Sequence, residues 1–156
     1  MVEDGKKAPN IKLPADDGTQ VSLTKLKGQQ VVVYFYPKDD TSGCTKEALA
    51  FTEHAAAFKA ANTLVLGISP DSVAKHEKFK AKHGLDVLLL ADEDKEAAEA
   101  YGVWVEKSMY GKKYMGVERS TFLIDAKGKV AQSWRKVKVP GHAEAVLEAA
   151  QALAAA

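Results

Sequence analysis

The sequence predicts an α/β fold in which a mixed central sheet carries helices on both faces and follows an N-terminal β-hairpin. Three observations support this: short apolar runs typical of buried strands, amphipathic segments that alternate with them, and an antiparallel strand pair near the C-terminal end. The chain has 156 residues, 46% hydrophobic and 28% charged, and shows no linker or repeat. Residues 1–156 are therefore expected to form a single domain.

The first predicted element is the hairpin. Asp16–Thr19 contains a turn sequence with glycine, and it lies between the alternating segments Ile11–Leu13 and Val21–Leu23. Such a turn between two short alternating segments is typical of two antiparallel strands.

Three buried strands are predicted next. Val31–Tyr36 is rich in β-branched and aromatic residues, is too short for a helix, and stops at Pro37. Leu64–Ile68 and Val87–Leu90 have the same character. Runs without polar alternation indicate strands that are covered on both faces, as in a parallel sheet.

Helices are predicted between and after these strands. In Thr45–Ala61, apolar residues recur at three- and four-residue steps on one face, and Cys44 lies on that face at the start of the segment. Further helices are expected at Ser72–His83, at Asp94–Tyr101 and after Gly141. A glycine directly after each of the first two segments predicts where those helices end.

An antiparallel pair completes the sheet. Thr121–Ile124 and Val130–Trp134 flank Asp125–Gly128, which is a typical hairpin turn. The predicted order is thus a hairpin, three strand and helix units, a second hairpin and a final helix. A thioredoxin-like arrangement satisfies that order.

Charge and hydropathy exclude several functional classes. Twenty-two basic and 21 acidic residues leave a net charge of +1, so no strong field attracts nucleic acid or an anionic membrane. The longest apolar run, Val31–Tyr36, is far shorter than the ~20 residues that span a bilayer. Met1–Asp4 lacks the basic and apolar regions of a signal peptide. We expect a cytoplasmic protein without nucleic-acid or membrane partners.

The single cysteine, Cys44, is the main candidate for chemistry. One cysteine excludes a disulfide framework within the chain and a cysteine-rich zinc site. Cys44 follows a polar turn and lies at a predicted helix N-terminus with Thr41 as N-cap, where backbone N–H groups and the helix dipole favour a thiolate. The alternative is a small buried hydrophobe. The polar neighbours Ser42 and Thr45 oppose that alternative.

Only Arg119 and Arg135 are arginines among the 22 basic residues. A guanidinium binds a carboxylate and still directs N–H groups at a thiolate or a peroxide oxygen. Arg119, just before a predicted strand, is the better candidate, and Glu47, one helical turn after Cys44, is placed to orient it. The alternatives are a surface ion pair for Arg119 and a solvated glutamate for Glu47. The histidines show no metal-binding spacing, so no metal site is expected.

The segment Pro37–Cys44 matches the motif Pro-x-x-x-Thr-x-x-Cys, and with Glu47 and Arg119–Phe122 it resembles the active site of peroxiredoxins. The resemblance is closest to the Q-type peroxiredoxins, also called bacterioferritin comigratory proteins. It covers nearly the whole chain. The segments that carry this closer resemblance are Tyr34–Thr41, Met109–Lys112 and Trp134–Val139.

The resemblance implies a thioredoxin fold and peroxide reduction without a metal or organic cofactor. It implies that Cys44 is oxidised to a sulfenic acid, that Thr41 and Arg119 hold hydrogen peroxide or an organic hydroperoxide, and that Pro37 shields the sulfur from water. It also suggests a monomer with a role in antioxidant defence.

The sequence departs from the family pattern at three positions. Ser42 replaces the usual proline of the turn, which predicts a looser loop. Leu49 and Lys80 stand where many relatives carry a second, resolving cysteine. The chain therefore resembles a one-cysteine type, whose sulfenic acid needs an external thiol. Thioredoxin and glutathione with glutaredoxin are both candidates.

Two other functions remain open at this point. A glutaredoxin-type thiol transferase is disfavoured because the catalytic Cys-x-x-Cys is missing. A redox-sensing or chaperone-like binding protein would use Cys44 oxidation only to switch a surface. Slow reaction with peroxide would favour this last function.

Overall fold

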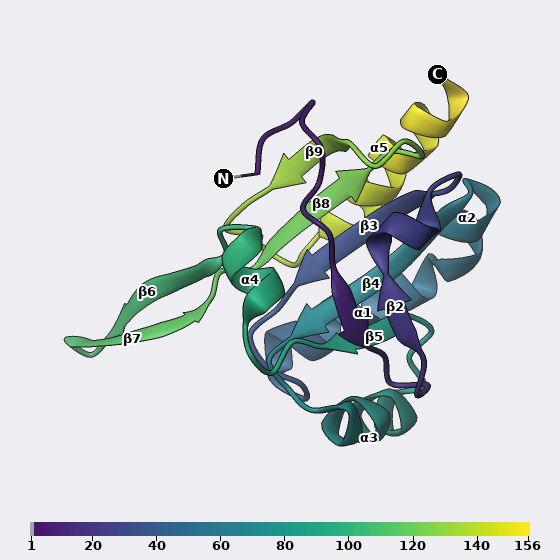
Figure 1. Ribbon diagram of the computed structural model, residues 1–156. Coiled ribbons are helices and arrows are strands. Elements are labelled where there is room, and N and C mark those ends of the chain that lie inside the picture. Colours follow the sequence, from purple (N-terminus) through teal and green to yellow (C-terminus); the bar gives the residue numbers. More distant parts are fainter. Residues whose placement is uncertain (1) are drawn as a thin grey trace.

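A five-stranded mixed sheet forms the centre of the computed structural model, which describes residues 2–156 (Figure 1). The strand order is β5-β4-β3-β8-β9. The strands are β3 (Gln30–Phe35), β4 (Thr63–Ser69), β5 (Leu88–Ala91), β8 (Ser120–Ile124) and β9 (Val130–Trp134). The first three are parallel, and β8 and β9 are antiparallel to their neighbours. The predicted α/β fold with a mixed sheet is confirmed.

The central strand β3 is buried along its whole length. Its side chains alternate between two apolar layers, because successive residues of a strand point to opposite faces. Val33 and Phe35 belong to one core, and Val32 and Tyr34 belong to the other. This double burial explains why the strand appears in the sequence as an apolar run without polar alternation.

Helices cover the two faces unequally. The Tyr34 face packs against α1 (Ser42–Glu53), α2 (Ala55–Ala60), α3 (Val73–His83) and α5 (His142–Ala155). The Phe35 face is covered by α4 (Glu96–Ala100) and by the N-terminal segment. In residues 2–156, no helix has the length and apolar character needed to cross a membrane.

The N-terminal hairpin lies on the Phe35 face. It consists of β1 (Lys12–Pro14) and β2 (Gln20–Ser22), as predicted, and the short 3₁₀ helix η1 (Leu23–Leu26) follows it. Ala15 forms a single antiparallel bridge with Leu90 of β5. The hairpin therefore covers the edge strand of the sheet, which protects its unpaired backbone groups.

The prediction of one helix at Thr45–Ala61 is wrong. Helix α1 already begins at Ser42, so Cys44 lies inside its first turn. It ends at Glu53, and the backbone N–H of the next residue, His54, donates to Phe51 O at the tighter i→i+3 spacing, which interrupts the helical ladder. Helix α2 then continues to Ala60, and Phe58 returns to the core against Phe51.

Helix α4 is shorter than the predicted Asp94–Tyr101. Lys95 adopts a left-handed conformation with φ of 60°, which a right-handed helix cannot contain. The helix therefore starts at Glu96. Asp92 caps it from a distance, because its carboxylate accepts hydrogen bonds from the backbone N–H groups of Ala97 and Ala98.

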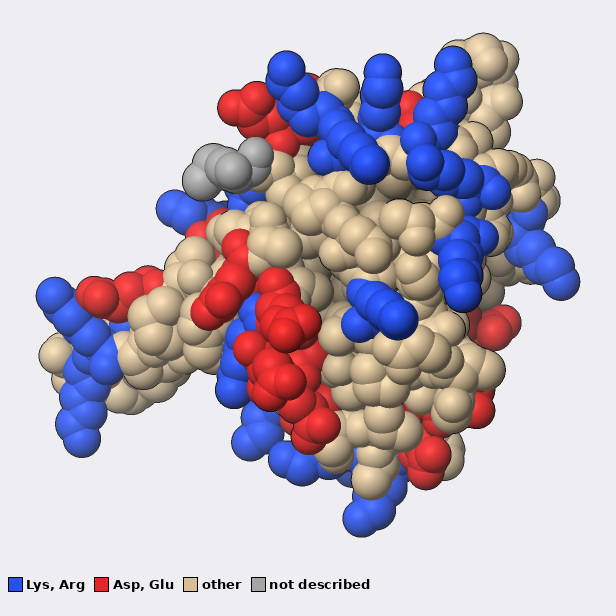
Figure 2. Space-filling model, in the orientation of Figure 1, with Lys and Arg blue, Asp and Glu red and all other residues tan. Residues whose placement is uncertain are grey.

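A third hairpin, which was not predicted, is formed by β6 (Trp104–Met109) and β7 (Lys112–Val117). It projects from the body of the molecule, and basic side chains lie at its end (Figures 1 and 2). Its strands are mostly exposed, so the alternation of buried and exposed residues that signals a strand is weak. The usable signal was the two-residue turn Tyr110-Gly111, whose residues both have positive φ.

Candidate active site

Cys44 lies where the buried strand β3 passes through a polar turn into α1. Thr41 has the extended conformation of an N-cap residue, and its carbonyl oxygen accepts the first helical hydrogen bond, from Thr45 N. Cys44 is the third residue of the helix and only 2% exposed. The helix dipole and the free N–H groups of this turn thus act close to the sulfur.

Strand pairing brings Arg119 to the same place. In the antiparallel pair β3·β8, Phe35 lies opposite Ser120. Arg119 therefore lies beside the end of β3, where the turn to Cys44 starts. Residues 75 positions apart in the sequence become neighbours only through this register.

The Arg119 guanidinium bridges two groups of α1. Its Nη1 donates to Glu47 Oε1 at 2.6 Å, and its Nη2 donates to Cys44 Sγ at 3.3 Å. The guanidinium is rigid and planar, so its two nitrogens hold the carboxylate and the sulfur at a fixed separation. The single nitrogen of lysine cannot do this. A sulfur that accepts such a bond differs from the small buried hydrophobe considered as the alternative.

Glu47 is a buried anchor for Arg119 and is not solvated. The residue is 1% exposed, and its Oε2 has no hydrogen-bond partner within the described chain. Burial raises the pKa of Glu47 to about 7, although the charge and hydrogen bonds of Arg119 lower it. Burial opposes the charge on Arg119, but Glu47 and Cys44 raise its pKa above the usual value. The guanidinium therefore remains charged.

The raised pKa of Glu47 predicts that stability depends on pH. The unfolded carboxyl group releases its proton near pH 4.5 and the folded one near pH 7, so the folded protein binds more protons between these values. We expect the free energy of unfolding to fall as the pH rises from about 4.5 to about 7, by up to roughly 3 kcal/mol, and then to level off. Urea unfolding across this range measures the effect.

Two variants separate Glu47 from the other titrating groups. Glu47→Gln is expected to remove this fall. Glu53→Gln changes an exposed carboxyl group near the end of the same helix and is expected to retain it. The same pH dependence in wild type and Glu47→Gln would contradict the assignment.

Gly43 lies against the guanidinium. A Cβ atom at this position would be 3.2 Å from Arg119 Nη2, which is tighter than about nine in ten real Cβ contacts. The backbone here is helical, so a methyl group causes no conformational strain. The small size of Gly43 instead allows Arg119 to approach Cys44.

Gly43→Ala is expected to stabilise the fold and slow the reaction with peroxide. Alanine favours the helix by up to about 1 kcal/mol, whereas displacement of Arg119 by a few tenths of an ångström is expected to slow Cys44 oxidation about two- to fivefold. Thermal unfolding and stopped-flow oxidation measure the two effects. Ser42→Ala, one residue earlier, is the control, and equal oxidation rates in the two variants would contradict the argument.

Thr41 and Pro37 lie in the turn before the helix. The Thr41 hydroxyl donates to Lys38 O at 2.9 Å, and the side chain is exposed. Its side chain makes no hydrogen bond to Cys44 or Arg119 in the described part of the molecule. Pro37 is half-buried. Of the predicted site residues, the structure thus brings Cys44, Glu47 and Arg119 into direct contact.

Arg135 has a different environment. Its guanidinium lies over the Phe122 ring, 5.2 Å from the ring centre, and Nη2 faces Tyr101 O at 3.5 Å. These contacts explain the second arginine as a packing residue. No group of three potential metal ligands occurs among residues 2–156.

Two further residues near the site, Tyr34 and His142, were not predicted as site residues from the sequence. Tyr34 is fully buried in stacking contact with Phe51, and burial raises the pKa of Tyr34 well above its usual value. His142 donates or accepts a 2.7 Å hydrogen bond with Thr121 Oγ1. Burial and the nearby Arg119 charge lower the pKa of His142 to about 4, so its ring is neutral at neutral pH. Neither residue has a local motif that identifies it.

Sequence comparisons place this arrangement among known proteins. The pattern of the AhpC/TSA family matches residues 5–133. A putative peroxiredoxin bcp from Coxiella burnetii is 51% identical, and the match covers 94% of this chain and 97% of the relative. Peroxiredoxin Bcp from Bacillus subtilis is 50% identical, with 97% and 95% covered.

Solved structures of similar proteins superpose closely on this chain. Bacterioferritin comigratory protein from Xanthomonas campestris, studied for its alkyl peroxide reduction activity, superposes with a TM-score of 0.91 at 44% identity, covering 97% of this chain and 99% of the other. A cysteine-to-serine variant of PrxQ from Xylella fastidiosa gives a TM-score of 0.92 at 40% identity, covering 97% of each chain.

Proposed function

Because the chain belongs to the AhpC/TSA family and is a thiol-dependent peroxidase of the peroxiredoxin Bcp type, we propose that its reaction takes place at Cys44. The observation that carries the proposal is the Arg119 guanidinium, which touches both Cys44 Sγ and Glu47 Oε1. A cation held by a buried carboxylate against a sulfur at a helix N-terminus stabilises a thiolate and the negative charge that develops during its attack.

The reaction is a displacement at oxygen. The Cys44 thiolate attacks one peroxide oxygen, an S–O bond forms as the O–O bond breaks, and the leaving oxygen takes up a proton to become water or an alcohol. Cys44 becomes a sulfenic acid, and the peroxide is reduced by two electrons. Arg119 Nη2 donates toward the sulfur and stabilises the charge shared by sulfur and oxygens.

Thr41 and Pro37 complete the proposed site. The Thr41 hydroxyl uses its proton on Lys38 O, so its oxygen is free to accept a hydrogen bond from the peroxide O–H. That bond aligns the peroxide with the attacking sulfur. Half-buried Pro37 limits the access of water to Cys44, and Glu47 orients Arg119.

An external thiol completes the cycle. Cys44 is the only cysteine of the chain, so its sulfenic acid condenses with an outside thiol to a mixed disulfide and water, and a second thiol then releases Cys44. We propose thioredoxin or glutathione with glutaredoxin as the source of these thiols, hydrogen peroxide and organic hydroperoxides as substrates, a monomer as the active form, and the cytoplasm as the compartment.

Rapid mixing of the fully reduced protein with one equivalent of hydrogen peroxide tests the proposal. We expect oxidation far faster than that of a free thiol, and a product with one added oxygen on Cys44 by mass spectrometry. Recovery of the thiol is then followed with each of the two reductant systems. Oxidation at the rate of a free cysteine would overturn the proposal and favour a redox-sensing protein.

A further inference from the structure

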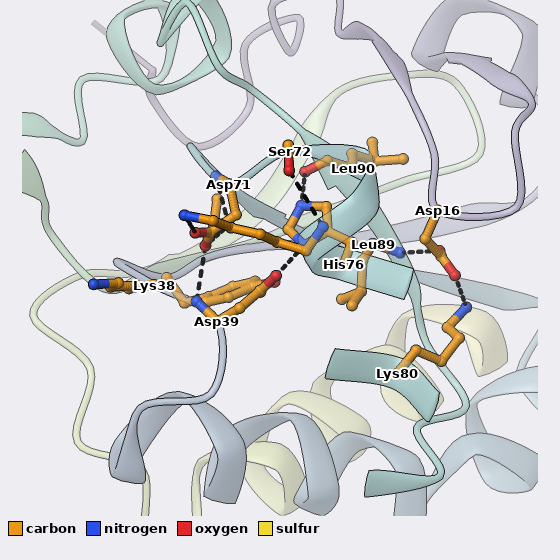
Figure 3. Close-up of polar contacts among 12 residues, drawn as sticks. Asp16, Lys38, Asp39, Asp71, Ser72, His76, Lys80, Leu89 and Leu90 are labelled. Carbon is orange, nitrogen blue, oxygen red and sulfur yellow. Dashed lines mark hydrogen bonds and ion pairs between the residues drawn. The ribbon is translucent and has the colours of Figure 1, made fainter. Parts of the chain in front are cut away.

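Two polar contacts to largely buried aspartates attach α3 to other parts of the molecule (Figure 3). Lys80 Nζ lies 2.7 Å from Asp16 Oδ2, in the N-terminal hairpin. His76 Nδ1 lies 2.6 Å from Asp39 Oδ2, in the turn that leads to Cys44. The two aspartate side chains are 5% and 6% exposed. One attachment thus reaches the active-site turn and the other does not.

The His76 ring lies between two hydrogen-bond acceptors. Nδ1 faces the Asp39 carboxylate, and Nε2 faces the backbone carbonyl oxygen of Leu90 at 2.9 Å. A carbonyl oxygen only accepts, so Nε2 carries a proton. The ring is completely buried, so water does not supply another partner.

Asp39 is held by two side chains. Its Oδ1 accepts a 2.6 Å hydrogen bond from the Tyr36 hydroxyl, and its Oδ2 is hydrogen-bonded to His76 Nδ1 at 2.6 Å. The Asp39 side chain is therefore fixed at both oxygens.

The same residue fixes the turn through its backbone. Asp39 N donates to Asp71 Oδ2 at 2.8 Å, and Asp71 in turn accepts from Ser69 Oγ. The next residue, Asp40, has φ of 59°, an unfavourable conformation for a residue with a side chain, and it bonds to α3 through Lys82. Helix α3 therefore holds this part of the turn.

We infer that the completely buried His76 is a positioning residue for peroxide reduction, acting through its hydrogen bond to Asp39 on the turn before Cys44. The inference rests on the proposed function. Asp39 lies five residues before Cys44, in the same turn as Thr41. Loss of this hydrogen bond frees the turn to move relative to Arg119, which is held by a different element. Small displacements of reacting groups slow such reactions considerably.

Charged side chains also lie around Asp39. Lys38, Asp40, Lys78 and Lys82 line the same surface hollow as Asp39. Asp71 faces the backbone of Asp39, and Lys75 Nζ lies 3.9 Å from Asp71 Oδ1 at the protein surface. Just after β3, the Tyr36 hydroxyl donates to Asp39. His76 is the completely buried side chain of α3 that bonds Asp39 directly.

His76→Gln tests the inference against a matched control. The glutamine amide is not a ring with nitrogens on opposite sides and does not reproduce both hydrogen bonds of His76, so we expect the rate of Cys44 oxidation to fall about three- to tenfold. Lys80→Gln breaks the contact of α3 with Asp16, away from the active-site turn, and is expected to keep the wild-type rate even where stability falls. Asp39→Asn should resemble His76→Gln, and the double variant should be no slower than either single one.

A spectroscopic measurement on the wild-type protein does not depend on whether a variant folds. We expect long-range ¹H–¹⁵N correlation spectra to show a proton on His76 Nε2, which faces the Leu90 carbonyl oxygen. An Nε2 without a proton would overturn the inference, as would a Lys80→Gln variant as slow as His76→Gln, or a His76→Gln variant as fast as wild type. Failure of the wild-type protein to react quickly at Cys44 would instead overturn the proposed function.

Discussion

Replacing Cys44 by serine is expected to abolish peroxide reduction, with a loss of at least about a thousandfold. A serine hydroxyl is not ionised at neutral pH, and the Arg119 and helix N-terminus that stabilise a thiolate do not supply enough energy to ionise it. An oxygen attacking peroxide would also have to form a new weak O–O bond. Peroxide consumption in the presence of excess reductant measures the loss.

Thr45→Ser is the control for this substitution. Thr45 follows Cys44 in the first turn of α1, and its backbone N–H bonds to Thr41 O irrespective of its side chain. We expect Thr45→Ser to keep nearly the wild-type rate. Residual catalysis in Cys44→Ser above the rate of buffer alone would show that another group reacts with peroxide.

Arg119→Lys is expected to slow Cys44 oxidation at least tenfold, which corresponds to about 1.4 kcal/mol of activation free energy. Lysine keeps the charge but has a single nitrogen, which cannot bond Glu47 Oε1 at 2.6 Å and Cys44 Sγ at 3.3 Å with the geometry of the guanidinium. The Glu47 carboxylate then competes with the sulfur for the cation. Stopped-flow oxidation at constant pH measures the change.

Arg135→Lys makes the same chemical change away from the sulfur. Arg135 packs on Phe122 and faces a backbone carbonyl, so its replacement is expected to lower stability slightly and leave the oxidation rate unchanged. Equal oxidation rates for Arg119→Lys and wild type would remove Arg119 from the mechanism. A slow Arg135→Lys variant would mean that any loss of guanidinium slows the reaction.

Much of the fold was predictable because its signals are local. The strand β3 is a continuous apolar run since both of its faces are buried, and the end of α3 is marked by Gly84, whose φ is 62°. The hairpin β6–β7 was missed because exposed strands bury too little to create a pattern. The interruption at His54 was missed because apolar spacing continues across it.

The candidate site also has features that were predictable from local sequence and features that were not. Cys44, its polar turn and the helix start are contiguous, so the sequence alone determined that a lone cysteine lies at a helix N-terminus. Arg119 was identified as a rare residue type before a strand, but its contact with Cys44 depends on the β3·β8 register. The tertiary structure decided that Glu47 is buried and that Gly43 makes room for the guanidinium.

The attachment of His76 to Asp39 was decided by tertiary structure alone. The two residues are 37 positions apart, and nothing near either one in the sequence indicates that they meet. Hydrophobic periodicity, caps and turns reflect free energies that act within a few residues, so a sequence displays them directly. Burial, charge pairing and strand register depend on which distant segments pack together, and they arise only when the chain has folded.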